Sequence, residues 1–67
     1  MHSIDDIFAA LPQVDLCLWI LSDNGSDGWY AALCEEGRPS VQFHGNGATA
    51  ADALARALED AGVKVDG

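Results

Sequence analysis

Cys17, Cys34 and His44 are the first side chains to consider for chemistry. A catalytic histidine needs a nucleophile and an orienting acid beside it, and the sequence pattern holds no serine or cysteine near His44. The two cysteines lack Cys-x-x-Cys spacing and, with two distant histidines, do not match a zinc-ligand pattern. They are either two thiols that pack as small apolar side chains or a cross-strand disulfide. The sequence therefore disfavours an enzyme and predicts no cofactor or metal.

The segment 23–28, Asp-Asn-Gly-Ser-Asp-Gly, has the oxygen-rich character of a calcium loop. An EF-hand has acids at alternating positions, a glutamate at the twelfth position and a helix on each side. Here the spacing differs and strands are expected on both sides, so the segment predicts a hairpin turn. Gly45-Asn46-Gly47 is too short for a phosphate-binding loop, and no Lys or Arg follows it closely.

The acidic residues are the stronger candidate site. The chain has 11 Asp and Glu against 3 Lys and Arg, which gives a formal net charge of -8. This charge repels nucleic-acid phosphates and attracts basic protein surfaces. The array could imitate a nucleic acid, and the alternative is a surface that only keeps the protein soluble. The predicted partner-binding residues are Asp23, Asp27, Glu35 and Glu36 at two turns, Asp5, Asp6 and Asp15 near the N-terminus, and the aromatic Trp29.

A length of 67 residues predicts a single domain over 1–67. A domain of this size buries only about 60% of the surface of its unfolded chain, so its stability is expected to be marginal. The N-terminus has no signal-peptide pattern, and no apolar run reaches the length of about 18 residues that a membrane span needs. These features predict a cytoplasmic protein with no membrane partner, in the host cytoplasm if a phage encodes it.

Two helices and three strands are expected along the chain. Apolar residues at helical spacing over 4–11 follow a capping Ser3, and Pro12 ends this short helix. Thr49 is a good N-cap for an alanine-rich amphipathic helix over 50–61, and Gly62 suits its C-terminal end. Turn residues separate three strands, which are predicted over 14–22, 29–35 and 40–45.

A hairpin that pairs Ser22 with Trp29 places Cys17 opposite Cys34, and a tight second turn then pairs Cys34 with Val41. One face of the sheet would form the core under the C-terminal helix, with Cys17, Trp19, Leu21, Tyr30, Ala32, Cys34, Val41 and Phe43. The other face would carry Leu16, Leu18, Ile20, Trp29, Ala31, Leu33, Gln42 and His44, under the N-terminal helix or a second subunit. A homodimer through Leu16, Leu18 and Leu33 is one way to cover that face. A slip of one residue would exchange the faces.

The segment 16–58 resembles the HicB-like antitoxin domain, whose fold is related to the double-stranded-RNA-binding domain. The resemblance rests on Asp-Gly-Trp-Tyr-Ala-Ala at 27–32, on Gly45-x-Gly47-x-Thr49, and on Ala-Asp-Ala-Leu-Ala-Arg-Ala-Leu at 51–58. The family's proline-glycine element before the third strand is not clear here, and no C-terminal DNA-binding module follows. The basic residues of an RNA binder are also missing. The chain is also similar in general type to phage anti-CRISPR inhibitors, because it is short and acidic and has no enzyme motif.

The sequence thus predicts an α+β fold: a short N-terminal helix, a three-stranded antiparallel meander, and a C-terminal amphipathic helix packed on the sheet. The function expected first is a phage-type inhibitor that binds a basic nucleic-acid-binding surface of a host complex. The alternative is a HicB-like antitoxin or regulatory module that binds a small basic toxin. Direct nucleic-acid binding is not expected from this charge.

Overall fold

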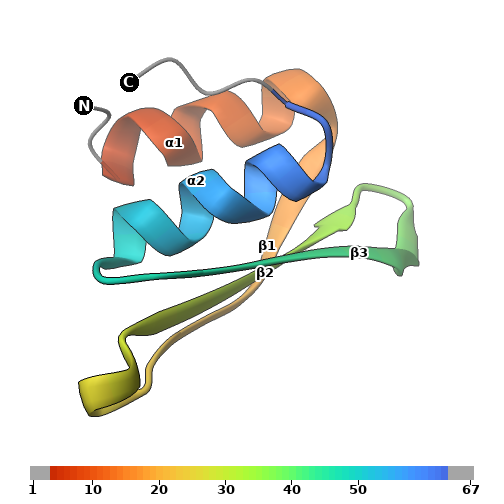
Figure 1. The fold of residues 1–67 in the computed structure, drawn as a ribbon. Coiled ribbons are helices and arrows are strands. Elements are labelled where there is room, and N and C mark those ends of the chain that lie inside the picture. The colour runs from red at the N-terminus through yellow and green to blue at the C-terminus, as the bar shows by residue number, and fades with distance from the viewer. Residues whose placement is uncertain (1–3, 64–67) are drawn as a thin grey trace.

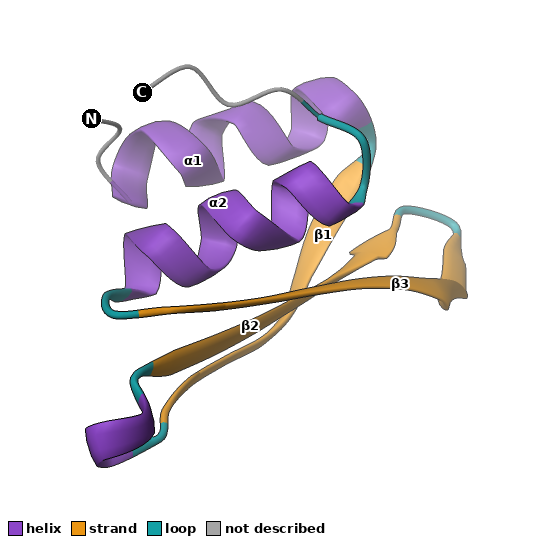
Figure 2. Cartoon of the chain, in the orientation of Figure 1, coloured by secondary structure: helices purple, strands orange, loops and turns teal. Residues whose placement is uncertain are grey.

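The structure is a computed structural model that describes residues 4–63. Three antiparallel strands form one sheet in the order β1-β2-β3, and both helices lie on the same face of it (Figures 1 and 2). The predicted α+β fold is confirmed. The elements are α1 (Ile4–Ala10), a 3-10 turn (Leu11–Val14), β1 (Leu16–Asp23), a second 3-10 turn (Gly25–Asp27), β2 (Trp29–Glu35), β3 (Arg38–Gly47) and α2 (Ala50–Asp60).

The N-terminal segment differs from the prediction at its C-terminal end. The α-helix ends at Ala10, and the chain continues through Pro12 in a 3-10 turn, because proline suits the first positions of a helical turn. Asp15 then adopts a left-handed conformation with φ of 58°. This reversal makes β1 begin at Leu16 and not at residue 14. The predicted cap Ser3 lies outside the described residues.

The ends of α2 agree closely with the prediction. Thr49 is the N-cap, and its side-chain oxygen accepts a hydrogen bond from the backbone N–H of Asp52 at 3.1 Å. Gly62 follows the helix with φ of 84°, which glycine adopts without the steric cost of a side chain. The carbonyl of Leu58 accepts a hydrogen bond from the N–H of Val63 at 2.9 Å. None of the helices in 4–63 is long and apolar enough to cross a membrane.

Replacing Thr49 with alanine is expected to destabilise the protein by about 1 kcal/mol, because an N–H at the start of α2 loses its acceptor. For a domain of this size, the thermal midpoint should fall by about 4–8 °C. Differential scanning fluorimetry can measure this shift. The matched control is Ser40→Ala, which removes a hydroxyl from an exposed position of β3 and should leave the midpoint within about 2 °C. Equal shifts in the two variants would contradict the capping role.

One hydrophobic cluster fills the space between the helices and the sheet. Leu33, Leu54 and Leu58 are its largest fully buried side chains. The helix α1 contributes to the same cluster, so it does not cover the opposite face of the sheet. The buried members are Ile7, Leu11, Leu16, Ala31, Leu33, Ala53, Leu54, Ala57 and Leu58.

The pairing of β1 with β2 contains an irregularity between Leu18 and Ile20. The predicted pair Cys17 and Cys34 is confirmed, but Trp29 pairs with Asp23 and not with Ser22. Trp19 is the extra residue of this bulge, because Leu18 pairs with Leu33 and Ile20 pairs with the adjacent Ala32. Since a bulge places two residues opposite one, it compensates for a hairpin turn that begins one residue later than predicted.

The predicted faces of β2 were exchanged, because the pairing of β2 with β3 differs by one residue. Cys34 pairs with Gln42 and not with Val41, and Ala31 lies opposite Gly45. Trp29, Ala31 and Leu33 therefore face the helices, with Leu16 and Leu21 of β1 and Phe43 of β3. Of the predicted core face, Cys17, Tyr30, Ala32 and Cys34 lie on the open side of the sheet, and Trp19 is 51% exposed.

Two glycines of β3 let the backbone of α2 approach the sheet. A Cβ atom on Gly45 would lie 2.3 Å from the backbone nitrogen of Ala57 and 2.4 Å from the carbonyl oxygen of Ala53. A Cβ atom on Gly47 would lie 2.7 Å from the nitrogen of Ala53. Alternate residues of a strand and residues four apart in a helix each point to one side, so the two glycines match the two alanines. This contact fixes which side of β3 faces the helix.

Candidate functional site

The predicted acidic residues of the two turns lie at opposite ends of the sheet. Asp23 and Asp27 are at the β1–β2 turn, whereas Glu35 and Glu36 are at the β2–β3 turn. The strand β2 between them has seven residues and spans about 20 Å. Figure 1 shows the two turns at opposite ends of this strand. These four acids therefore do not form one array. They form two acidic ends, which we call the Asp27 end (Asp23 and Asp27) and the Glu36 end (Asp15, Glu35 and Glu36).

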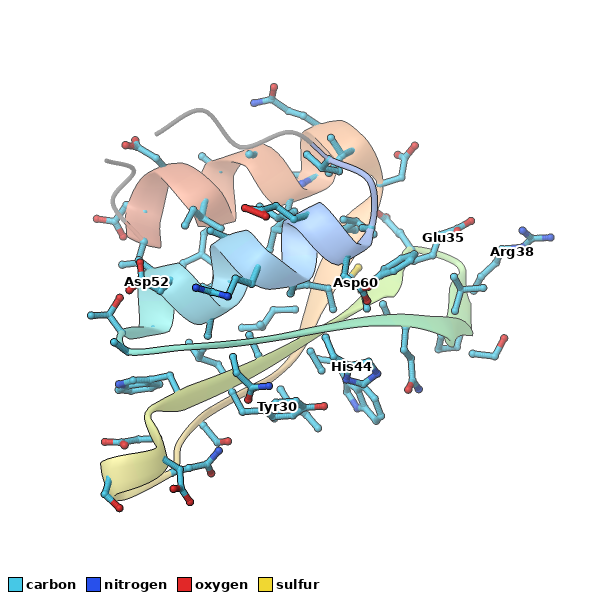
Figure 3. All side chains as sticks on the ribbon, viewed as in Figure 1. Tyr30, Glu35, Arg38, His44, Asp52 and Asp60 are labelled. Carbon is cyan, nitrogen blue, oxygen red and sulfur yellow. The ribbon has the colours of Figure 1, made fainter. Side chains whose placement is uncertain are left out.

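At the Glu36 end, the backbone brings Asp15 beside the turn. The N–H of Glu36 donates to the carbonyl oxygen of Asp15 at 2.9 Å, and both side chains are exposed. The carboxylate of Glu35 lies 3.8 Å from the guanidinium of Arg38 (Figure 3). Because this ion pair is exposed, it contributes little stability, but it partly neutralises Glu35. Asp15 and Glu36 are the acids of this end best placed to contact a partner.

At the Asp27 end, Asp23 also shapes the turn. Its carboxylate accepts a hydrogen bond from the N–H of Gly25 at 2.8 Å, and the N–H of Asn24 donates to the carbonyl of Gly28 at 2.7 Å. Asp27 is exposed. Trp29, which was predicted to contact a partner, is half-buried and packs against the core. Because the carboxylate of Asp23 holds the turn, Asp27 is the acid of this end better placed to contact a partner.

The helices carry further exposed acids. Asp5 and Asp6 lie in the first turn of α1, as predicted. Sequence reasoning placed Asp52, Glu59 and Asp60 on the wet face of α2 but did not include them among the candidate residues. Asp60 has a structural role, since its carboxylate accepts a hydrogen bond from the backbone N–H of His44 at 3.1 Å. The helical spacing of the polar residues in 50–61 was the signal that could have placed Asp52, Glu59 and Asp60 among the candidate partner-binding residues.

The side of the sheet away from the helices, which we call the open face, has nine members in the regularly paired parts of the described strands, and none of the nine is Asp, Glu, Lys or Arg. Cross-strand partners point to the same side of a sheet, so its members follow from the register. Figure 3 shows Tyr30 and His44 on this side, away from both helices. The members of the open face are Cys17, Ile20 and Ser22 of β1, Tyr30, Ala32 and Cys34 of β2, and Gln42, His44 and Asn46 of β3.

Tyr30 and His44 form a pair on the open face. The phenol oxygen of Tyr30 is hydrogen-bonded to Nδ1 of His44 at 2.5 Å, and their rings are stacked with centroids 5.9 Å apart. No serine or cysteine hydroxyl or thiol is among the hydrogen-bond partners of His44 in 4–63. The pair therefore orders the side chains of two neighbouring strands and does not have the arrangement of a nucleophile with its base.

The two cysteines are free thiols, both half-buried. Partial burial raises the pKa of the Cys17 thiol, and the nearby Glu36 and Cys34 raise it further. A raised pKa keeps the thiol protonated at neutral pH, which opposes the thiolate that nucleophilic catalysis needs. Within residues 4–63, no three His, Cys, Asp or Glu side chains come together as a group that could hold a metal ion.

The face predicted for a homodimer is not available as predicted. Leu16 is 6% exposed and Leu33 is fully buried, because the protein's own helices cover them. Leu18 is 40% exposed, so one of the three predicted residues can reach a second subunit. The other large apolar side chains exposed in the described range are Val14 and Trp19.

Comparison with known proteins found no matching family model, and no curated protein or solved structure with significant similarity.

Proposed function

We propose that this chain is a small acidic inhibitor of the phage anti-CRISPR type, which binds a basic nucleic-acid-binding surface of a host protein complex. The observation that carries the proposal is the placement of charge. Every acidic side chain in 4–63 is exposed, except Glu35, which is half-exposed. No charged side chain of that range is buried, and its basic side chains are Arg38 and Arg56. The negative field is therefore directed entirely at the solvent.

A basic groove supplies the complementary field. Attraction between such surfaces accelerates encounter and weakens as salt screens it. The Asp27 end and the Glu36 end are separated by about 20 Å, which along one strand of B-DNA corresponds to about six phosphates. A groove that holds a nucleic-acid segment of this length would contact both ends together. Occupying the groove would exclude the nucleic acid, which is how the chain would inhibit its partner.

The first experiment captures partners on the immobilised protein from a host lysate at low and at high salt, and identifies them by mass spectrometry. The proposal expects a nucleic-acid-binding protein that is captured at low salt and released at high salt. Increasing amounts of its nucleic acid should displace the captured partner from the immobilised chain. A partner that binds the chain and its nucleic acid simultaneously would contradict the inhibitory mechanism.

Charge reversal at the two ends is expected to weaken the binding of that partner. Asp27→Lys and Glu36→Lys should each raise the Kd by about tenfold, which corresponds to about 1.4 kcal/mol, because attraction at one end becomes repulsion. The double variant should lose about a hundredfold if the two ends act independently. Isothermal titration calorimetry at low salt measures both changes.

Glu59→Lys is the matched control, because it makes the same change in net charge at an exposed position of α2. A positive charge is favourable in the last turn of a helix, so this variant should fold normally and lower the affinity by less than about threefold. The proposal would be falsified if Asp27→Lys and Glu36→Lys each bound the partner as tightly as Glu59→Lys.

In the alternative function, a HicB-like antitoxin or regulatory module, the same acidic residues would bind a small basic toxin. The residues on which that resemblance rests have structural duties in this fold: Thr49 caps α2, and Gly45 and Gly47 lie against its backbone. They therefore add no argument for a toxin as the partner. The lysate capture distinguishes the two functions, because a short basic toxin would be recovered in place of a nucleic-acid-binding complex.

A further inference from the structure

Cys17 and Cys34 lie directly opposite each other on neighbouring antiparallel strands. The flanking pairs, Leu16 with Glu35 and Leu18 with Leu33, are regular on both sides. Directly opposed residues have Cα atoms about 4.5 or 5.5 Å apart, depending on the hydrogen-bonding position. Both values are within the range of about 4.4–6.8 Å that disulfides occupy. The pairing therefore holds the two Cα atoms at a separation that a disulfide can span.

The remaining adjustment is small and falls on a strand that can move. Opposed Cβ atoms are about 4.5–5.5 Å apart, whereas a disulfide holds them at about 3.8 Å, so the strands must approach by about 1 Å. β1 is at the edge of the sheet, and its pairing is already irregular just beyond Leu18. It can approach β2 without displacing another strand of the sheet. Both thiols are half-buried and point to the open face, where a small oxidant can reach them.

We propose that Cys17 and Cys34 are an oxidation site at which a low-molecular-weight disulfide forms a reversible cross-strand bond that ties β1 to β2. This proposal is independent of the proposed function. The bond would lie on the open face beside Ala32, between the bulge and the Glu36 end. It would close the hairpin whose β1–β2 turn carries Asp23 and Asp27, and it would hold the edge strand in place.

The reaction is two successive thiol–disulfide exchanges. One cysteine loses its proton, and its thiolate attacks the reagent R–S–S–R, forming a protein–S–S–R mixed disulfide and releasing one R–S⁻. The thiolate of the second cysteine then attacks the protein sulfur of that mixed disulfide and releases the second R–S⁻. The two protons from the cysteines end on the two R–SH products. The protein loses two electrons and two protons, and the reagent gains them.

The surroundings of the pair select the charge of the oxidant. Glu36 lies near Cys17 and contributes to its raised pKa, and the whole chain has a formal net charge of -8. Both disfavour an anionic reagent and favour a cationic one. Cystamine, a cationic disulfide, should therefore oxidise the pair at least about tenfold faster than the anionic glutathione disulfide at low salt, and the difference should shrink as salt rises.

The test treats the folded protein with cystamine and follows it by intact mass spectrometry without reductant. The expected product is a monomer lighter by two hydrogen atoms, which a dithiol reductant converts back. The singly modified intermediate should not accumulate, since the second exchange is intramolecular. The oxidised protein should unfold at a midpoint higher by about 10 °C, because the bond closes a hairpin loop and restricts the unfolded chain.

Cys17→Ser and Cys34→Ser are the matched controls. Each retains one thiol and should end as a mixed disulfide with a single cystamine half, with no gain of stability. Cys17→Ala replaces Cys17→Ser if the serine variant does not fold. The proposal is overturned if the folded wild-type protein ends with two reagent halves, remains reduced, or forms disulfide-linked dimers in place of the lighter monomer.

Discussion

Replacing Gly45 with alanine should lower the thermal midpoint by roughly 15 °C. The new Cβ atom would lie within 2.4 Å of backbone atoms of Ala53 and Ala57, and a backbone cannot yield as the end of a flexible side chain can. The helix α2 must therefore move away from β3, which costs about 3 kcal/mol for an overpacked core. Alanine is intrinsically better than glycine in a strand by about 0.5–1 kcal/mol, so the steric cost dominates.

Asn46→Ala is the control for this variant, because residue 46 is adjacent in β3 but exposed on the open face. It should shift the midpoint by less than about 3 °C, as surface substitutions do. Circular dichroism during a thermal ramp measures both variants. If Gly45→Ala melted within a few degrees of the wild-type protein, α2 would not lie against β3 at the distance described here.

Leu33→Ala should destabilise the protein by about 3 kcal/mol, within the range of about 2–5 kcal/mol for buried leucines. Leu33 is fully buried and belongs to the core cluster between the sheet and the helices. Its loss leaves a cavity between the sheet and both helices. A domain of this size has a total stability of only about 3–10 kcal/mol, so the loss removes from about a third to all of it.

Leu18→Ala makes the same chemical change in the cross-strand partner of Leu33. Leu18 is 40% exposed, so its truncation should cost less than about 1 kcal/mol. Urea denaturation gives the free energy of unfolding of both variants. The difference tests how deeply each leucine is buried on the helix side of the sheet: equal costs, or a larger cost for Leu18→Ala, would contradict the burial of Leu33 under the two helices.

The open face and the acidic ends divide the surface into regions of different chemistry. Acidic side chains lie at the turns and on the helices, while the nine members of the open face have no Asp, Glu, Lys or Arg among them. The two proposals can fail separately, because partner binding tests the acidic ends and the formation of an intramolecular disulfide tests the open face. If partner binding did not depend on salt, the inhibitor proposal would be wrong, and the proposal of a disulfide between Cys17 and Cys34 would still stand.

Local signals in the sequence were sufficient for the helix α2. Thr49, the alanine-rich stripe and Gly62 each act on the backbone within one turn of the helix, through capping, propensity and positive φ. The three strands and both turns were also predictable, since apolar runs are interrupted by Asp, Asn, Gly and Pro. The strand ends were less accurate, because β1 begins after a left-handed Asp15 that no local pattern requires.

Only the tertiary structure decided the faces of the sheet. Both faces of β1 and β2 are apolar in the sequence, so hydrophobic alternation could not select between them. The bulge at Trp19 and the close approach of α2 to Gly45 and Gly47 selected the observed register. Both depend on contacts between segments far apart in the chain. The same contacts decided which acids gather at each end of the sheet.

The sequence by itself determined the strong negative charge, the two helices and the three-stranded meander, because composition and short-range propensity act residue by residue. The predicted pair Cys17 and Cys34 was also correct, but only because the bulge at Trp19 offsets a turn that begins one residue later than predicted. The tertiary structure decided that the acids form two separated ends, that Trp29 packs on the core, and that the cysteines lie on the open face. These outcomes depend on strand pairing, in which a shift of one residue moves every side chain to the other face.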